Sequence, residues 1–114
     1  MKVAIPRFGE SVAPCFGYSA TIAIFTVKRG KVVGQADFCL QSTDILDRVR
    51  LLRDQEVGTL ICGGVQEPLD DMLQANGVRV ISWVSGTVEE LLDCYLRGEL
   101  IAGSGRIGTG KEAK

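Results

Sequence analysis

The order of apolar and amphipathic segments along the chain constrains its fold more than any other feature. Segments rich in β-branched and apolar residues predict five strands, at residues 1–5, 21–28, 31–40, 59–62 and 78–84. Segments with apolar residues at helical spacing predict three helices, at residues 43–55, 67–76 and 87–97. Three strands in succession, followed by alternating helices and strands, predict an α/β fold with a mixed five-stranded sheet and helices on its faces.

Local signals mark where several of these elements begin and end. Gly30 permits the tight turn between the second and third strands. Asp44 falls in the first turn of the first helix and stands four residues before Arg48, so the spacing predicts an ion pair between them. Thr87 and Glu90 have the spacing of a capping box, which predicts the start of the last helix.

Length and composition indicate a single domain. The chain has 114 residues, of which 46% are hydrophobic and 24% charged, as is usual for a globular domain with a real core. Residues 1–102 are expected to form this domain. Residues 103–114 are rich in glycine and lack apolar periodicity, so they are expected to be a flexible tail.

Charge and residue usage exclude several classes of function. The net charge of −1 gives no basic excess for nucleic acid, and no apolar run is long enough to cross a membrane. The chain contains no histidine, which removes Ser-His and Cys-His catalytic sites and zinc sites that use histidine. The carboxylates mostly fall on helix faces expected to be solvated, so with no histidine we expect no enzymatic activity. The N-terminal strand has a single lysine and does not resemble a signal peptide, so we expect a cytoplasmic protein.

The first cysteine lies in an unusual loop. Cys15 stands between Pro14 and the pair Phe16 and Gly17, and both the proline and the glycine restrict or shape the local backbone. The loop is therefore expected to be stiff and to present a single thiol. Thiolates are nucleophiles and soft metal ligands, and a nearby Arg7 would favour the ionised form. The simpler interpretation is a small loop residue that packs beside Phe16.

Several candidate residues are expected at one edge of the sheet. Ligands of α/β folds bind beyond the carboxyl ends of parallel strands, which here lie at residues 6–8 with Arg7, at residues 62–64 with Cys62, Gly63 and Gly64, and near residues 82–86. The two glycines are either a tight strand-to-helix turn or a place where the backbone approaches an anionic ligand. Cys62 is either an inert buried thiol or a ligand at the end of its strand.

The other two cysteines, Cys39 and Cys94, are expected to have packing roles. No two of the four cysteines are close enough in sequence for a C-x-x-C pair. A thiol redox function is therefore the weakest of the hypotheses, because Cys15 has no resolving cysteine near it in the sequence.

Four stretches of the chain together resemble one protein family. Residues 12–20, Val-Ala-Pro-Cys-Phe-Gly-Tyr-Ser-Ala, are similar to the Pro-His-Phe-Gly or Pro-Arg-Phe-Gly loop of the dinitrogenase iron–molybdenum cofactor biosynthesis family. Residues 60–64, Leu-Ile-Cys-Gly-Gly, resemble its second signature, and residues 76–81 and 86–100 resemble its closing segments. The order and spacing of these pieces carry the resemblance, which extends over residues 1–100. Cys15 replaces the histidine or other residue that is common at its position.

The resemblance implies a ribonuclease-H-like three-layer α/β/α fold with a five-stranded mixed sheet. It also implies an accessory protein, related to nitrogen fixation, that binds or carries an iron–sulfur or molybdenum–iron–sulfur cluster. The metal ligands would be Cys15 and Cys62, and the other cluster-binding residues would be Arg7, Phe16, Gly17, Gly63 and Gly64. Its partners would be cofactor-assembly or recipient proteins, and the chain would be a monomer or a homodimer.

An alternative of a different class is a metal-free binding or regulatory module. It would have the same fold and would use the same loop edge to hold a partner. Metal content in freshly purified anaerobic protein separates the two hypotheses.

Overall fold

The computed structural model describes residues 1–42 and 44–103 of the chain. The predicted tail, apart from Gly103, lies outside the described residues, so the domain boundary at residue 102 stays a prediction. None of the helices in the described part is long and apolar enough to cross a membrane.

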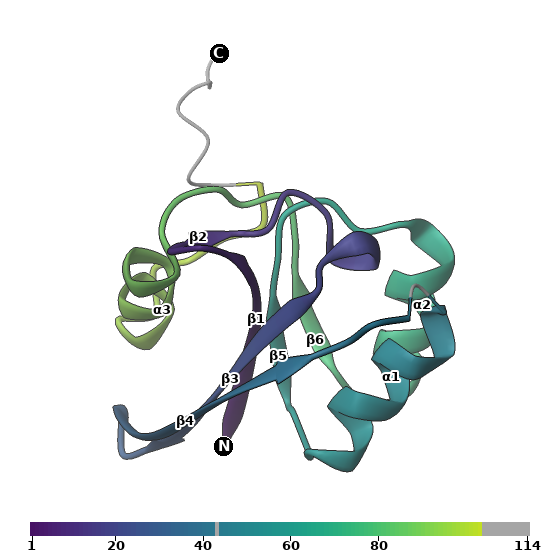
Figure 1. Cartoon of the computed structure of the whole chain (residues 1–114). Coiled ribbons are helices and arrows are strands. Elements are labelled where there is room, and N and C mark those ends of the chain that lie inside the picture. Colours follow the sequence, from purple (N-terminus) through teal and green to yellow (C-terminus); the bar gives the residue numbers. More distant parts are fainter. Residues whose placement is uncertain (43, 104–114) are drawn as a thin grey trace.

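The centre of the fold is a mixed sheet (Figure 1). Its strands are β1 (Lys2–Phe8), β2 (Ser11–Val12), β3 (Thr21–Lys28), β4 (Lys31–Cys39), β5 (Thr59–Ile61) and β6 (Arg79–Ile81). The strand order is β4-β3-β1-β5-β6, and β2 pairs with β1 off this path. Strands β2, β3 and β4 pair antiparallel, whereas β5 pairs parallel with both β1 and β6. The predicted α/β fold with a mixed sheet is confirmed.

The sheet has six strands in place of the predicted five, because part of the predicted loop is paired. Arg7 pairs with Val12 and Phe8 with Ser11, which makes β1 and β2 a tight antiparallel hairpin. Gly9 permits this turn, with φ of 64° in the left-handed region. A two-residue strand is too short to give an alternating pattern, so nothing in the sequence distinguished it from a loop. The ribonuclease-H-like designation stays a prediction.

Three helices cover the two faces of the sheet. Helices α1 (Ile45–Asp54) and α2 (Glu67–Ala75) pack on one face and α3 (Val88–Leu96) on the other (Figure 1). Each face therefore has its own apolar core, and β1 and β3 contribute buried side chains to both. This three-layer arrangement agrees with the predicted one.

The helix starts follow from the local chemistry of the sequence. The Asp44 carboxylate accepts a hydrogen bond from the Leu46 backbone N–H at 2.9 Å and caps α1. Thr87 and Glu90 form the predicted capping box at the start of α3. Capping fixes where each helix begins, and so fixes the loops that join the helices to the preceding strands.

Candidate functional site

The Cys15 loop folds back onto the carboxyl ends of the parallel strands. Cys15 and Gly64 form an isolated parallel β-bridge through their backbones. The Phe16 N–H donates to the Gly64 carbonyl at 2.8 Å, and the Gly64 N–H donates to the Pro14 carbonyl at 2.7 Å. The structure thus brings together two segments that the sequence analysis placed at the same edge. In Figure 1 this edge lies at the top of the sheet, beside β2.

The two glycines after β5 make this close approach possible. A β-carbon at Gly63 would lie 2.7 Å from the carbonyl oxygens of both Ala13 and Pro14, which is closer than real contacts allow. A β-carbon at Gly64 would lie 3.2 Å from the Pro14 carbonyl oxygen. The backbone that approaches these glycines is therefore the chain's own loop, and both glycines are buried.

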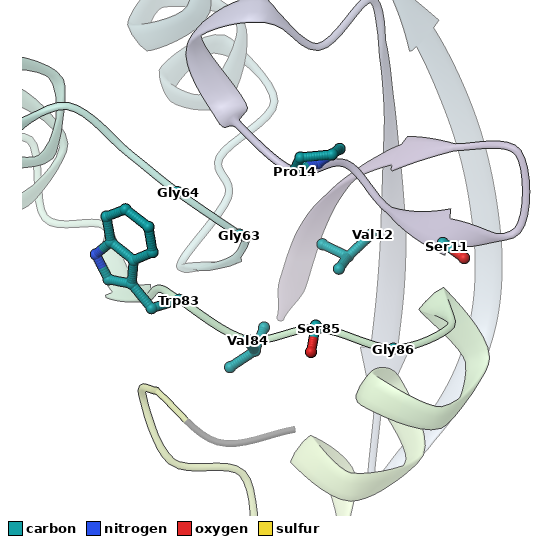
Figure 2. A pocket seen from close by; sticks show the side chains of 9 residues that line it. All are labelled: Ser11, Val12, Pro14, Gly63, Gly64, Trp83, Val84, Ser85 and Gly86. Carbon is teal, nitrogen blue, oxygen red and sulfur yellow. The ribbon is translucent and has the colours of Figure 1, made fainter. Parts of the chain in front are cut away.

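A first cavity, of about 470 Å³, lies between the Cys15 loop and the segment after β6. Figure 2 shows residues 11–14 facing residues 83–86 across it, with Gly63 and Gly64 at one end. Among the described residues, no charged side chain lines this cavity. Its lining residues are Ser11, Val12, Pro14, Gly63, Gly64, Trp83, Val84, Ser85 and Gly86.

Trp83 is a residue of this cavity that the sequence analysis did not single out. Its φ of 61° is unusual for a bulky side chain, and its N–H donates to the Gly63 carbonyl at 2.8 Å. A β-carbon at Gly64 would lie 3.2 Å from the indole ring, and Trp83 is 52% exposed. Backbone strain of this kind is concentrated at functional sites. The signal in the sequence was the only tryptophan of the chain, placed near the end of the predicted strand at residues 78–84.

A second cavity, of about 720 Å³, shares Pro14 with the first and is lined by Cys15. The thiol is half-buried, and Arg7 lies in the same wall. Phe8 and Tyr18 also line this cavity, and Phe8 is 79% exposed. Of the predicted site residues, Cys15 and Arg7 therefore share one cavity, while Gly63 and Gly64 line the neighbouring one.

Arg7 already has an anionic partner in this cavity. Its Nη1 lies 3.5 Å from the Asp37 carboxylate, and its Nε donates to the Gly9 carbonyl at 2.8 Å. Both side chains of the pair are partly exposed, so the attraction is weak and screened by salt. The Arg7 charge is therefore only partly offset by Asp37.

Phe16 and Gly17 form the turn that follows Cys15. Both residues are buried in this short 3₁₀ turn, Phe16–Tyr18. The Ser19 hydroxyl closes this turn by donating to the Phe16 carbonyl at 2.8 Å. A β-carbon at Gly17 would lie 4.0 Å from the Cys15 sulfur, so the turn places this glycine beside the thiol.

Cys62 lies deeper in the protein than Cys15. It is fully buried in the core beneath α1 and α2. Burial, aided by the negative charges of Asp70 and Cys15, raises the pKa of the Cys62 thiol to about 12. Metal binding requires the thiolate, so this environment favours the packing role of Cys62 over the ligand role.

The protein supplies few metal ligands at this edge. In the described part of the chain, no group of three or more cysteine, aspartate or glutamate side chains is placed to hold a metal ion. Cys15 is therefore a soft donor that would need additional ligands from outside this set. A large cluster that brings its own sulfide ligands fits this requirement better than a bare ion does.

Arg48 is the second residue that sequence reasoning missed. The spacing predicted an ion pair with Asp44, but Asp44 caps the helix and Arg48 is buried, with only 1% of its surface exposed. Its Nη2 donates to the Ser42 carbonyl at 3.2 Å. Burial lowers the pKa of this guanidinium, while the negative charges of Cys15 and Asp47 oppose the effect.

Comparison with known families identifies the group to which this domain belongs. A family model described as "Dinitrogenase iron-molybdenum cofactor" matches residues 1–98. The chain belongs to the dinitrogenase iron–molybdenum cofactor family. The resemblance seen in residues 1–100 is thereby confirmed, and the Cys15 loop, Gly63 and Gly64 all fall within the matched range.

Solved structures share the fold of this family member. PH0822 has a TM-score of 0.84 at 18% identity, with 91% of this chain and 96% of that chain covered. The apo form of the orange protein from Desulfovibrio gigas has a TM-score of 0.74 at 21% identity, covering 91% and 93%. A Thermotoga protein, TM1290, described as a candidate NifB protein of the DUF35 family, has a TM-score of 0.68 at 25% identity, covering 96% and 98%. A search of curated protein sequences gives no significant match.

Proposed function

We propose that this protein binds or carries an iron–sulfur or molybdenum–iron–sulfur cluster as an accessory protein in metallocofactor assembly. The observation that carries the proposal is the half-buried Cys15 thiol in the wall of a cavity of about 720 Å³, at the ligand-binding edge of the sheet. Membership of the dinitrogenase iron–molybdenum cofactor family supports this class of cargo. The proposal includes no catalysis, and it keeps the cytoplasmic location as a prediction.

Some of the site residues are proposed to coordinate the cluster, and others to shape its surroundings. Cys15 is the primary metal ligand, and Cys62 is a second ligand only if the core opens to expose it. Arg7 lies in the wall of the cavity and contributes positive charge there. The remaining cluster-binding residues act by shaping the loop around the thiol, and they are Phe16, Gly17, Gly63 and Gly64.

One thiol does not complete the coordination of a cluster. The other ligands would be the cluster's own sulfides, an external thiol, or the Cys15 of a second copy of the chain. The first two cases allow a monomer, and the last requires a homodimer around one shared cluster. Assembly or recipient proteins would be the partners that deliver or accept the cargo.

The alternative function is a metal-free binding or regulatory module. The observation in its favour is the group of exposed aromatic side chains around the two cavities, formed by Phe8, Tyr18 and Trp83. Exposed aromatic groups of this kind also mark surfaces that bind other proteins. In this case Cys15 would be part of the partner-binding surface and would not coordinate a metal.

Anaerobic reconstitution tests the proposal. The parent protein is incubated with iron, molybdate, sulfide and reductant, desalted, and analysed for metal content and visible absorption. Cys15→Ser is expected to abolish cluster uptake and to leave the circular dichroism spectrum unchanged. Cys94→Ser, which removes a thiol from α3 on the opposite face, is the matched control and is expected to load normally.

The outcomes separate the two functions. Equal loading of Cys15→Ser and the parent would show that the ligand assignment is wrong. A parent protein that takes up no metal under these conditions, and that retains a protein partner through Phe8 and Tyr18, would favour the metal-free module.

A further inference from the structure

Arg48 is a buried cation whose charge is incompletely compensated. It is the largest of the fully buried side chains in the structure. Within residues 1–42 and 44–103, its Nε and Nη1 atoms have no hydrogen-bond partner, and its Nη2 bonds only to the Ser42 carbonyl. Burying an unpaired charge is costly, so a protein keeps one only where an anion compensates for it or where it has a function.

The position of this cation relates it to the Cys15 loop. The guanidinium carbon of Arg48 lies 5.7 Å from the centre of the Phe16 ring, within the range of a cation–π contact. Phe16 directly follows Cys15, and its N–H is held by the Gly64 carbonyl. The guanidinium is therefore packed against the turn that presents the thiol.

Among the described residues, no carboxylate forms an ion pair with Arg48. The Asp47 carboxylate acts on the charge of Arg48, but it also lies 3.6 Å from Arg50, and the Cys15 sulfur acts on Arg48 only when it is ionised. In the cavity, Asp37 partly offsets the charge of Arg7. Asp70 accepts a hydrogen bond from Gln74, and its charge acts on the deeper Cys62.

We infer that Arg48 is a specificity-determining residue, whose buried positive charge makes the Cys15 site selective for anionic soft ligands over free metal cations. The charge is held away from water, so it is screened less than a surface charge. It attracts a metal–sulfur species of net negative charge and repels a bare cation that approaches the same thiol. This inference rests on the proposed function for its cargo, but its test requires no cluster.

The test compares two alkylating reagents of different charge at Cys15. Iodoacetate is an anion and iodoacetamide is neutral. In both reactions the thiolate sulfur attacks the methylene carbon, the C–S bond forms, the C–I bond breaks and iodide leaves. The ratio of the two rate constants, measured at one pH by peptide mass spectrometry, cancels the fraction of thiolate. The ratio therefore reports the local charge around Cys15.

The unmodified protein gives the first result. The iodoacetate to iodoacetamide ratio at Cys15 is expected to be about three- to tenfold higher in the native protein than in the urea-unfolded chain. A native ratio equal to or below the unfolded one would overturn the inference. No variant is needed for this comparison, so it does not depend on the folding of a mutant.

Two variants then assign the effect to Arg48. Arg48→Met keeps the length of the side chain without its charge, and it is expected to return the ratio at Cys15 to the unfolded value. Arg48→Lys keeps the charge, and it is expected to retain most of the parent ratio. An Arg48→Met protein with a native circular dichroism spectrum and the parent ratio would contradict the assignment.

Binding of Cd²⁺, a soft cation, gives an independent test, because loss of the Arg48 charge should strengthen cation binding while it lowers the iodoacetate to iodoacetamide ratio. Cd²⁺ titration followed by thiolate-to-metal absorption is expected to show about three- to tenfold tighter binding to Arg48→Met than to the parent. Weaker binding to the variant would overturn the inference. Failure of cluster reconstitution alone would count against the proposed function and would leave these rates and affinities unchanged.

Discussion

The Arg48 guanidinium carbon lies 5.7 Å from the centre of the Phe16 ring, and this contact joins helix α1 to the turn that follows Cys15. The same turn is joined to β5 by the two backbone hydrogen bonds between the loop and Gly64. Two separate interactions therefore hold the thiol in position. One is the pair of backbone hydrogen bonds to Gly64, and the other is the contact between the buried Arg48 guanidinium and the Phe16 ring. Each interaction can be weakened by a single substitution.

The close approach of the loop to Gly63 gives the first prediction. Gly63→Ala would place a methyl group 2.7 Å from the carbonyl oxygens of Ala13 and Pro14, and backbone atoms cannot yield as a flexible side chain can. The expected cost is about 1–3 kcal/mol in the free energy of unfolding, with a fall of several degrees in the melting temperature. Urea unfolding and calorimetry measure the two effects. Iodoacetamide should also label Cys15 faster as the loop loosens.

Gly58→Ala is the matched control for this substitution. A β-carbon at Gly58 would have no heavy atom within 4 Å, and the residue does not have a left-handed backbone conformation. Its stability is expected to stay within about 0.5 kcal/mol of the parent value. If both variants lost stability equally, the close approach of the loop at Gly63 would not be the cause.

The sequence allowed most of the fold to be predicted because the relevant signals are local. The capping box of Thr87 and Glu90 and the amphipathic spacing of the helices depend on residues a few positions apart. Placing the Cys15 loop and Gly63 at one edge needed only the rule that parallel strands end together. These predictions did not require knowledge of long-range contacts.

The parts of the site that were missed depend on contacts between distant segments. Arg48 has the i,i+4 spacing of a surface ion pair with Asp44, and only the packing of Phe16 against α1 turns it inward. Trp83 has a positive φ because its N–H reaches the Gly63 carbonyl. A sequence pattern predicts which residue types favour a conformation, but it does not contain the partner that enforces an unfavourable one.

The buried Cys62 thiol gives a prediction about alkaline stability. Its pKa is raised from 9.0 to about 12 in the folded protein, so the folded state keeps a proton that the unfolded chain loses above pH 9. The contribution of this group is fully present below pH 9 and is lost as the pH rises toward 12. The parent should lose on the order of 1 kcal/mol per pH unit in this window through this group.

Cys62→Ala isolates this contribution. The variant loses packing at all pH values, but its unfolding free energy should fall less steeply than that of the parent between pH 9 and 11. Urea denaturation at a series of pH values measures the difference in slope. Parallel curves for the two proteins would mean that Cys62 does not hold its proton in the folded state.

The exposed Arg7 and Asp37 pair gives the last prediction, because its charges line the same cavity as Cys15. Asp37→Asn removes the anion that partly offsets Arg7, so the iodoacetate to iodoacetamide rate ratio at Cys15 should rise about twofold at low salt. The stability should change by less than about 1 kcal/mol, as for other exposed pairs. Adding Arg7→Gln to the Asp37→Asn protein should reverse the gain in the ratio.

Salt distinguishes this surface effect from the effect of the buried cation. At 1 M salt the Debye length is about 3 Å, so the gain produced by Asp37→Asn should disappear. The difference between the parent and Arg48→Met should persist at the same salt concentration, because the guanidinium is buried. If the Asp37→Asn gain survived at 1 M salt, or if Arg7→Gln did not reverse it, the charge of Arg7 would not be its source. Such a result would point to a rearrangement of the β1–β2 hairpin, which circular dichroism and the labelling rate with neutral iodoacetamide would detect.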